Sequence, residues 1–517
     1  MMNKKQDLSE ERMHSLKQMA SSASLIFFFG ILGYIIMFFF RLLAARHFGP
    51  EGYGIYTLLE TIKGILFILA LCGTAEGIAR FVPYYLEKKE YAQLRGYLSF
   101  VFKFPFILSV ILTILTILFS DQITSFFGFP SSFSLYLQLT SFVFPLRVLS
   151  RVFRRICYAK KETFYATFSY DFLEKFILLA MMIIIFIFNL SLFWLVIGLI
   201  ASMVLPFLFD LLVYLKKIHL PKADHKVFLI KEWLVFSFPL FFVGLFSYVM
   251  GWSDNLVIAK YLPAEQLGIY AAAFSLGSLL DFFQRAFSPI FTPLITEQYV
   301  KGNHAEISFL FRKSAAWIFG LTFPIFLVMF FYAPFVLHFI FGEGYIPGAS
   351  VLMIIALGFL INIATGLNYN ILLLHQKTKV MFILNVIIVI SNVLMNIALI
   401  PYFGIVGPAL ASGGALALKE VISFFIAKRY EKISLDYRYN LKFILAGLPS
   451  ILIALFIFYQ IPHFYTGIIV SALIYVPLYI LFLLLLRTFK EEDYKILLVI
   501  EKRTGISFSF LKRFISH

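Results

Sequence analysis

A succession of long apolar segments constrains this chain more than any other feature of its sequence. A helix of about 20 residues spans the hydrocarbon core of a bilayer, and every segment is close to that length. Only 14% of the residues are charged, against about 25% in soluble domains. We therefore predict an all-α polytopic membrane protein with fourteen transmembrane helices. The predicted spans cover residues 22–45, 54–83, 97–119, 133–157, 172–189, 192–214, 233–258, 268–295, 314–336, 349–373, 380–400, 404–427, 442–460 and 465–486.

The connections between these segments alternate in charge. One set is rich in Lys and Arg, whereas the opposite set carries only Arg46 and Lys260. Positive residues favour cytoplasmic loops, so we predict that both termini are cytoplasmic. The formal net charge of +16 is then concentrated on the inner side of the membrane. The outer loops are short, which leaves no room for an outer or soluble enzyme domain.

The chain contains an internal repeat with an offset of 214 residues. Segment 45–56 reads ARHFGPEGYGIY, and segment 259–270 reads AKYLPAEQLGIY. The same offset places Phe127-Gly128 on Phe341-Gly342, and the turn at Asn189 on the turn at Phe403. Such repeats predict two parallel bundles, a framework for alternating access. We expect a first six-helix bundle with an N-terminal cytoplasmic segment over 1–232, a second over 233–440, and helices 13 and 14 with a basic cytoplasmic tail over 441–517.

The repeated turn belongs to a wider resemblance. Together with Asp254 and the sequence YFGIVGPA at 402–409, it resembles the polysaccharide-transporter branch of the multidrug/oligosaccharidyl-lipid/polysaccharide exporter superfamily. The resemblance implies fourteen helices arranged as six, six and two. It also implies a flippase that moves lipid-linked oligosaccharides across the cytoplasmic (plasma) membrane. Its partners would be that substrate and membrane lipids, with glycan-assembly enzymes as further partners, and we expect a monomer.

Basic residues inside the predicted spans are candidates for binding the substrate headgroup. Charges within a span are costly and usually face the bundle interior or a wet cavity. Span 133–157 carries Arg147, Arg151 and Arg154 on one face, with Arg155 beside them. A guanidinium group matches a phosphate with two hydrogen bonds, although Arg154 and Arg155 could instead reach the inner membrane surface. The predicted headgroup-binding residues are Arg147, Arg151, Arg80, Arg285 and Arg41.

Three acidic residues inside the spans stand three or four positions from a base. These pairs are Glu60 with Lys63, Glu76 with Arg80, and Asp281 with Arg285. Each pair could neutralise itself across one helical turn. Coupling of transport to protons or sodium ions is the alternative role. The predicted charge partners or coupling residues are Asp281, Glu76, Glu60, Lys63 and Asp254.

Amide side chains form a second polar pattern, in spans 349–373 and 380–400. Amides in membranes often bind neighbouring helices together. In a hydrated cavity they would instead form hydrogen bonds with sugar hydroxyls. The predicted sugar-contacting residues are Asn368, Asn370, Asn385, Asn392 and Asn396.

The sequence lacks the motifs of an enzyme. It has no GxxxxGK[ST] phosphate loop, no DxD, no Ser/His/Asp arrangement and no zinc spacing. We therefore expect no catalytic residues, no cofactor, no bound metal and no nucleic-acid partner. The membrane potential could supply the energy, because moving an anion outward gains about 2.3 kcal/mol per charge per 100 mV.

Three alternatives remain open at this point. A cation-coupled small-molecule exporter of the same superfamily would need an uncompensated acid and few arginines in its cavity. A lipid II flippase would share the same helix count. A membrane glycosyltransferase or polymerase would need acidic catalytic residues on an outer loop, where the sequence offers Asp121, Glu343, Glu51 and Glu265.

Overall fold

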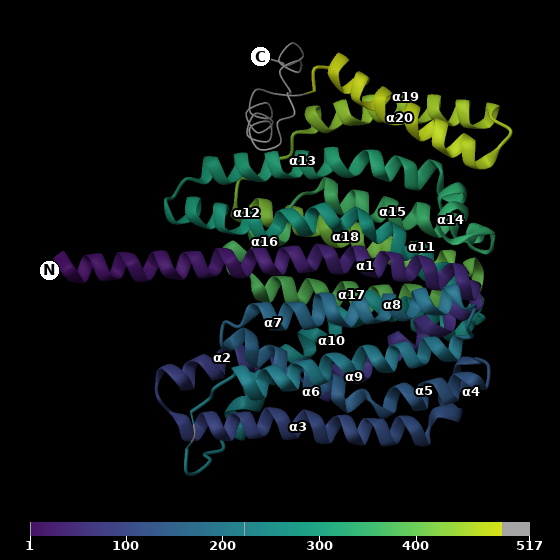
Figure 1. Ribbon diagram of the computed structural model, residues 1–517. Coiled ribbons are helices and arrows are strands. Elements are labelled where there is room, and N and C mark those ends of the chain that lie inside the picture. Colours follow the sequence, from purple (N-terminus) through teal and green to yellow (C-terminus); the bar gives the residue numbers. More distant parts are fainter. Residues whose placement is uncertain (1, 222, 489–517) are drawn as a thin grey trace. The chain divides into compact units, whose positions relative to one another are not determined.

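The computed structural model describes residues 2–221 and 223–488, with side chains from Ser24 onward. Every regular element in these residues is a helix (Figure 1). Among the described residues, twelve helical segments are long and apolar enough to cross a membrane. The prediction of an all-α polytopic membrane protein is therefore confirmed.

Two places in the chain account for the difference between these twelve segments and the fourteen predicted. The first predicted span and residues 54–71 of the second lie in one helix, α1 (Met2–Leu71), which is kinked at Gly49, where φ is 65°. The rest of the second span, 72–83, lies beyond this helix. The predicted span 172–189 corresponds to α8 (Glu174–Ile187), which has 14 residues. A π-helical stretch (Phe168–Leu173) and the short helix α7 (Thr163–Thr167) precede it. The count of fourteen and the cytoplasmic position of the termini stay predictions.

The chain divides into two compact units, Met1–Gly268 and Ile269–His517. The further helices of the first unit are α2 (Thr74–Glu87), α3 (Tyr91–Leu118), α4 (Ser120–Phe127), α5 (Ser132–Phe142), α6 (Phe144–Ala159), α9 (Leu192–Lys217) and α10 (Ile230–Tyr261). Helix α11 (Ala264–Gly277) begins in this unit and ends in the second.

Helix α6 lies among α2, α3 and α9 in the first unit (Figure 1). Its residues Val148, Val152 and Ile156 follow one another at intervals of four and are fully buried, as the helical period requires for one face of a helix. They pack in two apolar clusters that include aromatic side chains of α2 and α3. This packing fixes the rotation of α6 and so determines where its arginines lie.

Up to residue 488, where the described part of the chain ends, the second unit contains the 3₁₀ segments Ser278–Asp281 and Glu343–Gly348 and nine further helices. These helices are α12 (Phe282–Val300), α13 (His304–Phe331), α14 (Ala333–Phe341), α15 (Ala349–Ala364), α16 (Asn368–Leu374), α17 (Thr378–Phe403), α18 (Val406–Tyr430), α19 (Tyr437–Gln460) and α20 (Phe464–Leu485). Helix α18 packs against α15 and α17, and α19 packs against α20 and α13. The predicted domain limits stay a prediction, and residues 489–517 of the predicted basic tail lie outside the described residues.

The two copies of the repeated turn contact each other through glycine. A Cβ atom added to Gly54 would lie 1.8 Å from the carbonyl oxygen of Ala264, and one added to Gly268 would lie 1.9 Å from that of Pro50. Ala264 and Gly268 stand 214 residues after Pro50 and Gly54. The contact is therefore reciprocal, and its backbone-to-backbone approach leaves no room for a side chain.

Candidate functional site

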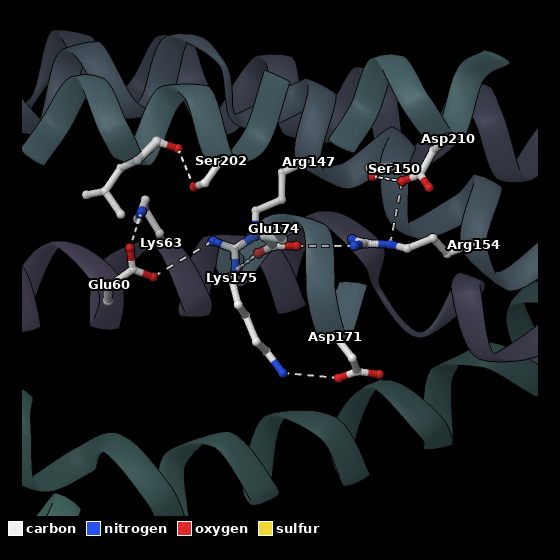
Figure 2. A network of polar contacts seen from close by, with 11 residues as sticks. Glu60, Lys63, Arg147, Ser150, Arg154, Asp171, Glu174, Lys175, Ser202 and Asp210 are labelled. Atoms are coloured by element: carbon white, nitrogen blue, oxygen red, sulfur yellow. Dashed lines mark hydrogen bonds and ion pairs between the residues drawn. The ribbon is translucent and has the colours of Figure 1, made fainter. Parts of the chain in front are cut away.

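Six charged side chains of the first unit form a chain in which bases and acids alternate (Figure 2). In order, the members are Lys63, Glu60, Arg147, Glu174, Arg154 and Asp210. We call this arrangement the charge chain. With three bases and three acids, its formal charge is zero.

One end of the charge chain lies on α1. The ammonium group of Lys63, only 1% exposed, donates a hydrogen bond to Glu60. The other carboxylate oxygen of Glu60 lies 3.9 Å from Arg147 Nη1, and the Arg147 guanidinium also lies over the ring of Phe67, 5.6 Å from its centre. Glu60, Lys63 and Phe67 stand three and four residues apart, so they share one face of α1 and reach Arg147 on α6 together.

The other end of the charge chain joins α6, α8 and α9. Glu174 bridges two arginines, with 3.5 Å from Oε1 to Arg147 Nη2 and 3.2 Å from Oε2 to Arg154 Nη1. Arg154 Nε lies 3.8 Å from Asp210 Oδ2, and Ser150 donates a hydrogen bond to the same oxygen. The side chains of Arg154 and Asp210 are each only 4% exposed. A buried charge is tolerated only when it is paired. The pair of Arg154 and Asp210 is therefore a structural contact that holds α6 against α9.

The middle of the charge chain is more accessible than its ends. The side chains of Arg147, Glu60 and Glu174 are 24%, 22% and 18% exposed. Arg147 is thus the most exposed member of the charge chain. Arg147 is the member best placed to exchange a carboxylate partner for a ligand.

A second group of charges, which we call the arginine triad, consists of Glu76, Arg151 and Arg155. Arg155 binds both carboxylate oxygens of Glu76, and Arg151 Nη2 lies 3.4 Å from one of them. The Glu76 side chain is 42% exposed. The Nε atoms of Arg151 and Arg155 are buried without a hydrogen-bond partner in the described part of the chain. With two bases and one acid, the triad carries a surplus of one positive charge.

A third ion pair borders the charge chain. Lys175 Nζ lies 3.1 Å from Asp171 Oδ1, and both side chains are labelled in Figure 2. The Tyr170 ring lies beneath the Arg154 and Lys175 charges, 4.9 Å and 5.4 Å from its centre. The charge chain, the triad and this pair together hold six bases and five acids, which leaves a formal charge of +1.

The predicted headgroup residues are only partly brought together. Arg147 and Arg151 lie in the charge chain and the triad. Arg80 is exposed and lies over the ring of Phe236, 4.6 Å from its centre. Arg41 is half-buried and makes no ion pair with any described residue. Arg285 belongs to the second unit.

The predicted pairing of Glu76 with Arg80 is wrong. Glu76 instead binds Arg151 and Arg155 of the neighbouring helix α6. Helix α2 packs against α6, so two guanidinium groups face Glu76, whereas Arg80 lies against aromatic rings. The predicted pair of Glu60 and Lys63 is confirmed. Asp254, the remaining predicted acid of the first unit, is buried in α10.

In the second unit, the predicted pair of Asp281 and Arg285 is confirmed, with 2.5 Å between Oδ2 and Nε. The predicted amides lie between helices. Asn370 donates to Ser288 and Thr292 of α12.

Two of the other amides also contact α18, whereas Asn396 contacts its own helix. Asn392 donates to Ser412 of α18, and Asn396 donates to Asn392. Asn368 lies 3.5 Å from Glu420 Oε2, and Asn385 is half-buried. These contacts are those of amides that bind helices together, and sugar contact stays a prediction.

Sequence reasoning missed the acids that complete the charge chain. Asp210 is an isolated acid inside the apolar segment 192–214, and Glu174 stands at the start of segment 172–189. An acid within a span is by default a candidate for function, so both could have been found. Their joint contact with Arg154 could not, because it depends on how α8 and α9 pack against α6. Among the described residues, no three His, Cys, Asp or Glu side chains form a group able to hold a metal ion.

Comparison with known proteins gives a consistent picture. The family described as "Polysaccharide biosynthesis protein" matches residues 42–350. An uncharacterized membrane protein of Methanocaldococcus jannaschii is 21% identical over 469 residues, which is 86% of this chain and 91% of that protein. A candidate O-antigen transporter of Shigella flexneri is 21% identical over 386 residues, or 71% of this chain and 87% of that protein.

Solved structures show the same fold. The lipid II flippase MurJ, in an inward closed conformation, aligns with a TM-score of 0.70 at 19% identity. The alignment covers 89% of this chain and 97% of that chain. At this identity the likeness establishes the fold and not the substrate.

Proposed function

This chain belongs to the polysaccharide biosynthesis protein family, in the polysaccharide-transporter branch of the multidrug/oligosaccharidyl-lipid/polysaccharide exporter superfamily, and on that premise we propose that it is a flippase. Its substrate would be a polyprenyl-linked oligosaccharide, carried from the cytoplasmic to the outer leaflet of the plasma membrane for surface polysaccharide or glycan assembly. The protein is a transporter and not an enzyme, and it works within a multi-pass membrane fold.

The surplus positive charge of the arginine triad carries this proposal. A phosphate or pyrophosphate headgroup needs accessible guanidinium groups with spare hydrogen-bond donors. The side chains of Arg151 and Arg155 are 27% and 24% exposed and share a single carboxylate. Their Nε atoms are buried and lack a partner in the described residues, so each guanidinium group retains an unused donor. We therefore place the first contact of the headgroup at the triad. Arg147, four residues earlier on α6, lies about 6 Å further along the helix axis and would take the second contact.

This assignment changes the simple clamp expected from the sequence. Each arginine of α6 already faces a carboxylate, so a headgroup binds by displacing a carboxylate rather than by filling a vacant site. In the proposal, Arg41, Arg80 and Arg285 contribute attraction at longer range. The sugars would contact the amides of the second unit, and the polyprenyl tail would remain in lipid.

The proposal retains the membrane arrangement expected from the sequence. We propose fourteen helices, as two six-helix bundles over 1–232 and 233–440 with two further helices over 441–517. Both termini would be cytoplasmic, and the protein would work as a monomer alongside glycan-assembly enzymes by alternating access. An anionic headgroup moving outward would gain energy from an inside-negative potential.

A flipping assay in proteoliposomes tests the proposal. A lipid-linked oligosaccharide is placed in both leaflets, and an external glycosidase digests what becomes accessible. We expect protein-dependent digestion beyond the outer half. The double variant Arg151→Gln, Arg155→Gln should lose most of it, because Glu76 then faces no cation and the triad no longer attracts an anion.

The matched control is Lys301→Gln, which removes a base from an exposed ion pair with Glu297 in the second unit. It should flip like the unchanged protein. Digestion that stops at half for the unchanged protein, with the oligosaccharide and with lipid II alike, would overturn the flippase and favour a small-molecule exporter. Full digestion by the double variant would remove the triad from the mechanism.

A further inference from the structure

The charge chain is neutral, and from this we propose that an anion binds at Arg147 together with one proton, which the carboxylates of Glu174 and Asp210 take up. The inference rests on the proposed function, because it concerns how the headgroup binds. In the resting state three bases balance three acids along the chain. A headgroup phosphate at Arg147 adds negative charge to the partly buried charge chain, which has no spare positive charge of its own; the surplus of the triad faces the first contact of the headgroup, at Arg151 and Arg155. Uncompensated charge in such surroundings is strongly disfavoured.

The contacts locate the excess charge once Arg147 turns to the anion. On one side, Lys63 and Glu60 remain a neutral pair. On the other side, Arg154 is left with two carboxylates, Glu174 at 3.2 Å and Asp210 at 3.8 Å. One cation cannot balance two acids. The negative charge that needs a proton is therefore at Glu174 and Asp210, and not at Glu60.

Glu174 is the more exposed carboxylate of the two, and it is the one that Arg147 contacts. Its side chain is 18% exposed, against 4% for Asp210. Oε1 of Glu174 is the oxygen that Arg147 releases, whereas Asp210 keeps its hydrogen bond from Ser150. A hydronium ion of the solvent gives its proton to Oε1: one O–H bond of hydronium breaks and leaves water, and one O–H bond forms at Oε1. Both carboxylates contact Arg154, so a proton on either one leaves Arg154 balanced by the other.

Other charged and titratable groups surround this pair, and none of them supplies the missing charge. Lys175 is occupied by Asp171 on the same helical segment. Arg151 and Arg155 bind Glu76, and their surplus charge serves an anion at the triad. The groups that act on the pair or on its arginines are Arg147, Arg154, Glu60, Lys63, Asp171, Lys175, Arg151, Tyr170, Tyr56 and Cys157.

The proton count of binding tests the inference directly on the unchanged protein. Calorimetry of lipid-linked oligosaccharide binding in detergent is run in two buffers with different heats of ionisation. We expect uptake of about one proton per headgroup bound. Binding with no proton uptake would overturn the inference, whereas absence of binding at any pH would count against the proposed function itself.

The pH dependence of flipping provides the second measurement, with equal pH on both sides of the vesicles. If one proton must bind with the anion, the apparent affinity falls by up to about tenfold per pH unit toward alkaline pH. Glu174→Gln carries a permanently neutral group, so its pH dependence should flatten. Glu297→Gln, which changes an exposed acid of the second unit, should keep the slope of the unchanged protein.

Each outcome of this series decides the matter. A Glu174→Gln variant that flips with the original slope would contradict proton uptake at the pair. If Glu174→Gln does not fold, Asp210→Asn serves in its place, because it also leaves Arg154 with a single carboxylate and should flatten the slope. Flipping that is independent of pH in the unchanged protein would reject proton linkage and leave the flippase intact.

Discussion

The two units carry related helices but differ sharply in the polar groups inside them. At the repeat offset of 214 residues, the charge chain has no charged counterpart in the second unit. The positions of Lys63, Glu60, Arg147, Glu174, Arg154 and Asp210 correspond to Gly277, Phe274, Ile361, Ile388, Asn368 and Phe424. The related helices of the second unit are therefore built without these charges. We infer that the accessible charges of the first unit, in the middle of the charge chain and in the triad, serve binding, whereas the buried pair of Arg154 and Asp210 holds them in place.

In the second unit, the polar contacts between helices are amide hydrogen bonds, and a buried carboxylate binds two histidines near helix ends. Amides of α16 and α17 join neighbouring helices. The Glu431 side chain, 1% exposed, accepts hydrogen bonds from His304 Nδ1 at 3.0 Å and His375 Nε2 at 3.1 Å. These contacts tie three connections of the unit together. They therefore hold parts of the second unit together. The triad of the first unit differs, because its two bases and one acid leave a net positive charge.

The largest expected effect is a loss of stability on replacing Arg154, compared with the replacement of Asn368 at the equivalent position of the second unit. Arg154→Met would leave Glu174 and Asp210 facing each other without their shared cation. Removing one partner of a buried ion pair costs about 3–5 kcal/mol. Asn368→Leu, at the corresponding position of the second unit, removes weaker contacts and should cost about 1–2 kcal/mol. Unfolding of the purified variants in detergent, followed by heat or denaturant, measures both. Equal losses would contradict the distinction between the units.

The next effect concerns the two copies of the repeated turn, in which Gly54 and Gly268 make equivalent close contacts. Gly54→Ala and Gly268→Ala each force a methyl group into a backbone carbonyl, and overpacking of this kind costs about 1–3 kcal/mol. Since the contact is reciprocal, the two losses should be similar, and the double variant should lose less than their sum.

The matched control for these glycines is Gly244→Ala in α10, where an added Cβ atom would meet nothing within 4 Å. Within a helix this change should stabilise by about 0.5–1 kcal/mol. The same unfolding measurement applies. A destabilised Gly244→Ala together with a neutral Gly54→Ala would show that the close approach at the turn does not exist.

Sequence reasoning predicted the helical membrane fold because apolar length and charge alternation are properties of single segments. It also predicted the pairs that lie on one helix, such as Glu60 with Lys63 and Asp281 with Arg285, since the helical period alone brings them together. It failed for Glu76, whose partners come from α6. Contacts between helices depend on packing rotation, and a single sequence does not encode that rotation in any local pattern. The neutrality of the charge chain became visible only after Glu174 and Asp210 were placed.

The smallest effect concerns the arginine that the sequence grouped with those of α6. Arg285 is 64% exposed in its pair with Asp281, and exposed pairs contribute about 0–1 kcal/mol. Arg285→Gln should therefore change the free energy of unfolding by less than about 1 kcal/mol, and it should slow flipping less than Arg147→Gln. A headgroup competes with carboxylates for Arg147, which contacts both Glu60 and Glu174. Arg285 lies outside that network, so its loss removes no such contact. The ratio of initial flipping rates for the two variants decides it. If Arg285→Gln proved the slower of the two, the headgroup would bind in the second unit, and the contrast between the units would have to be reversed.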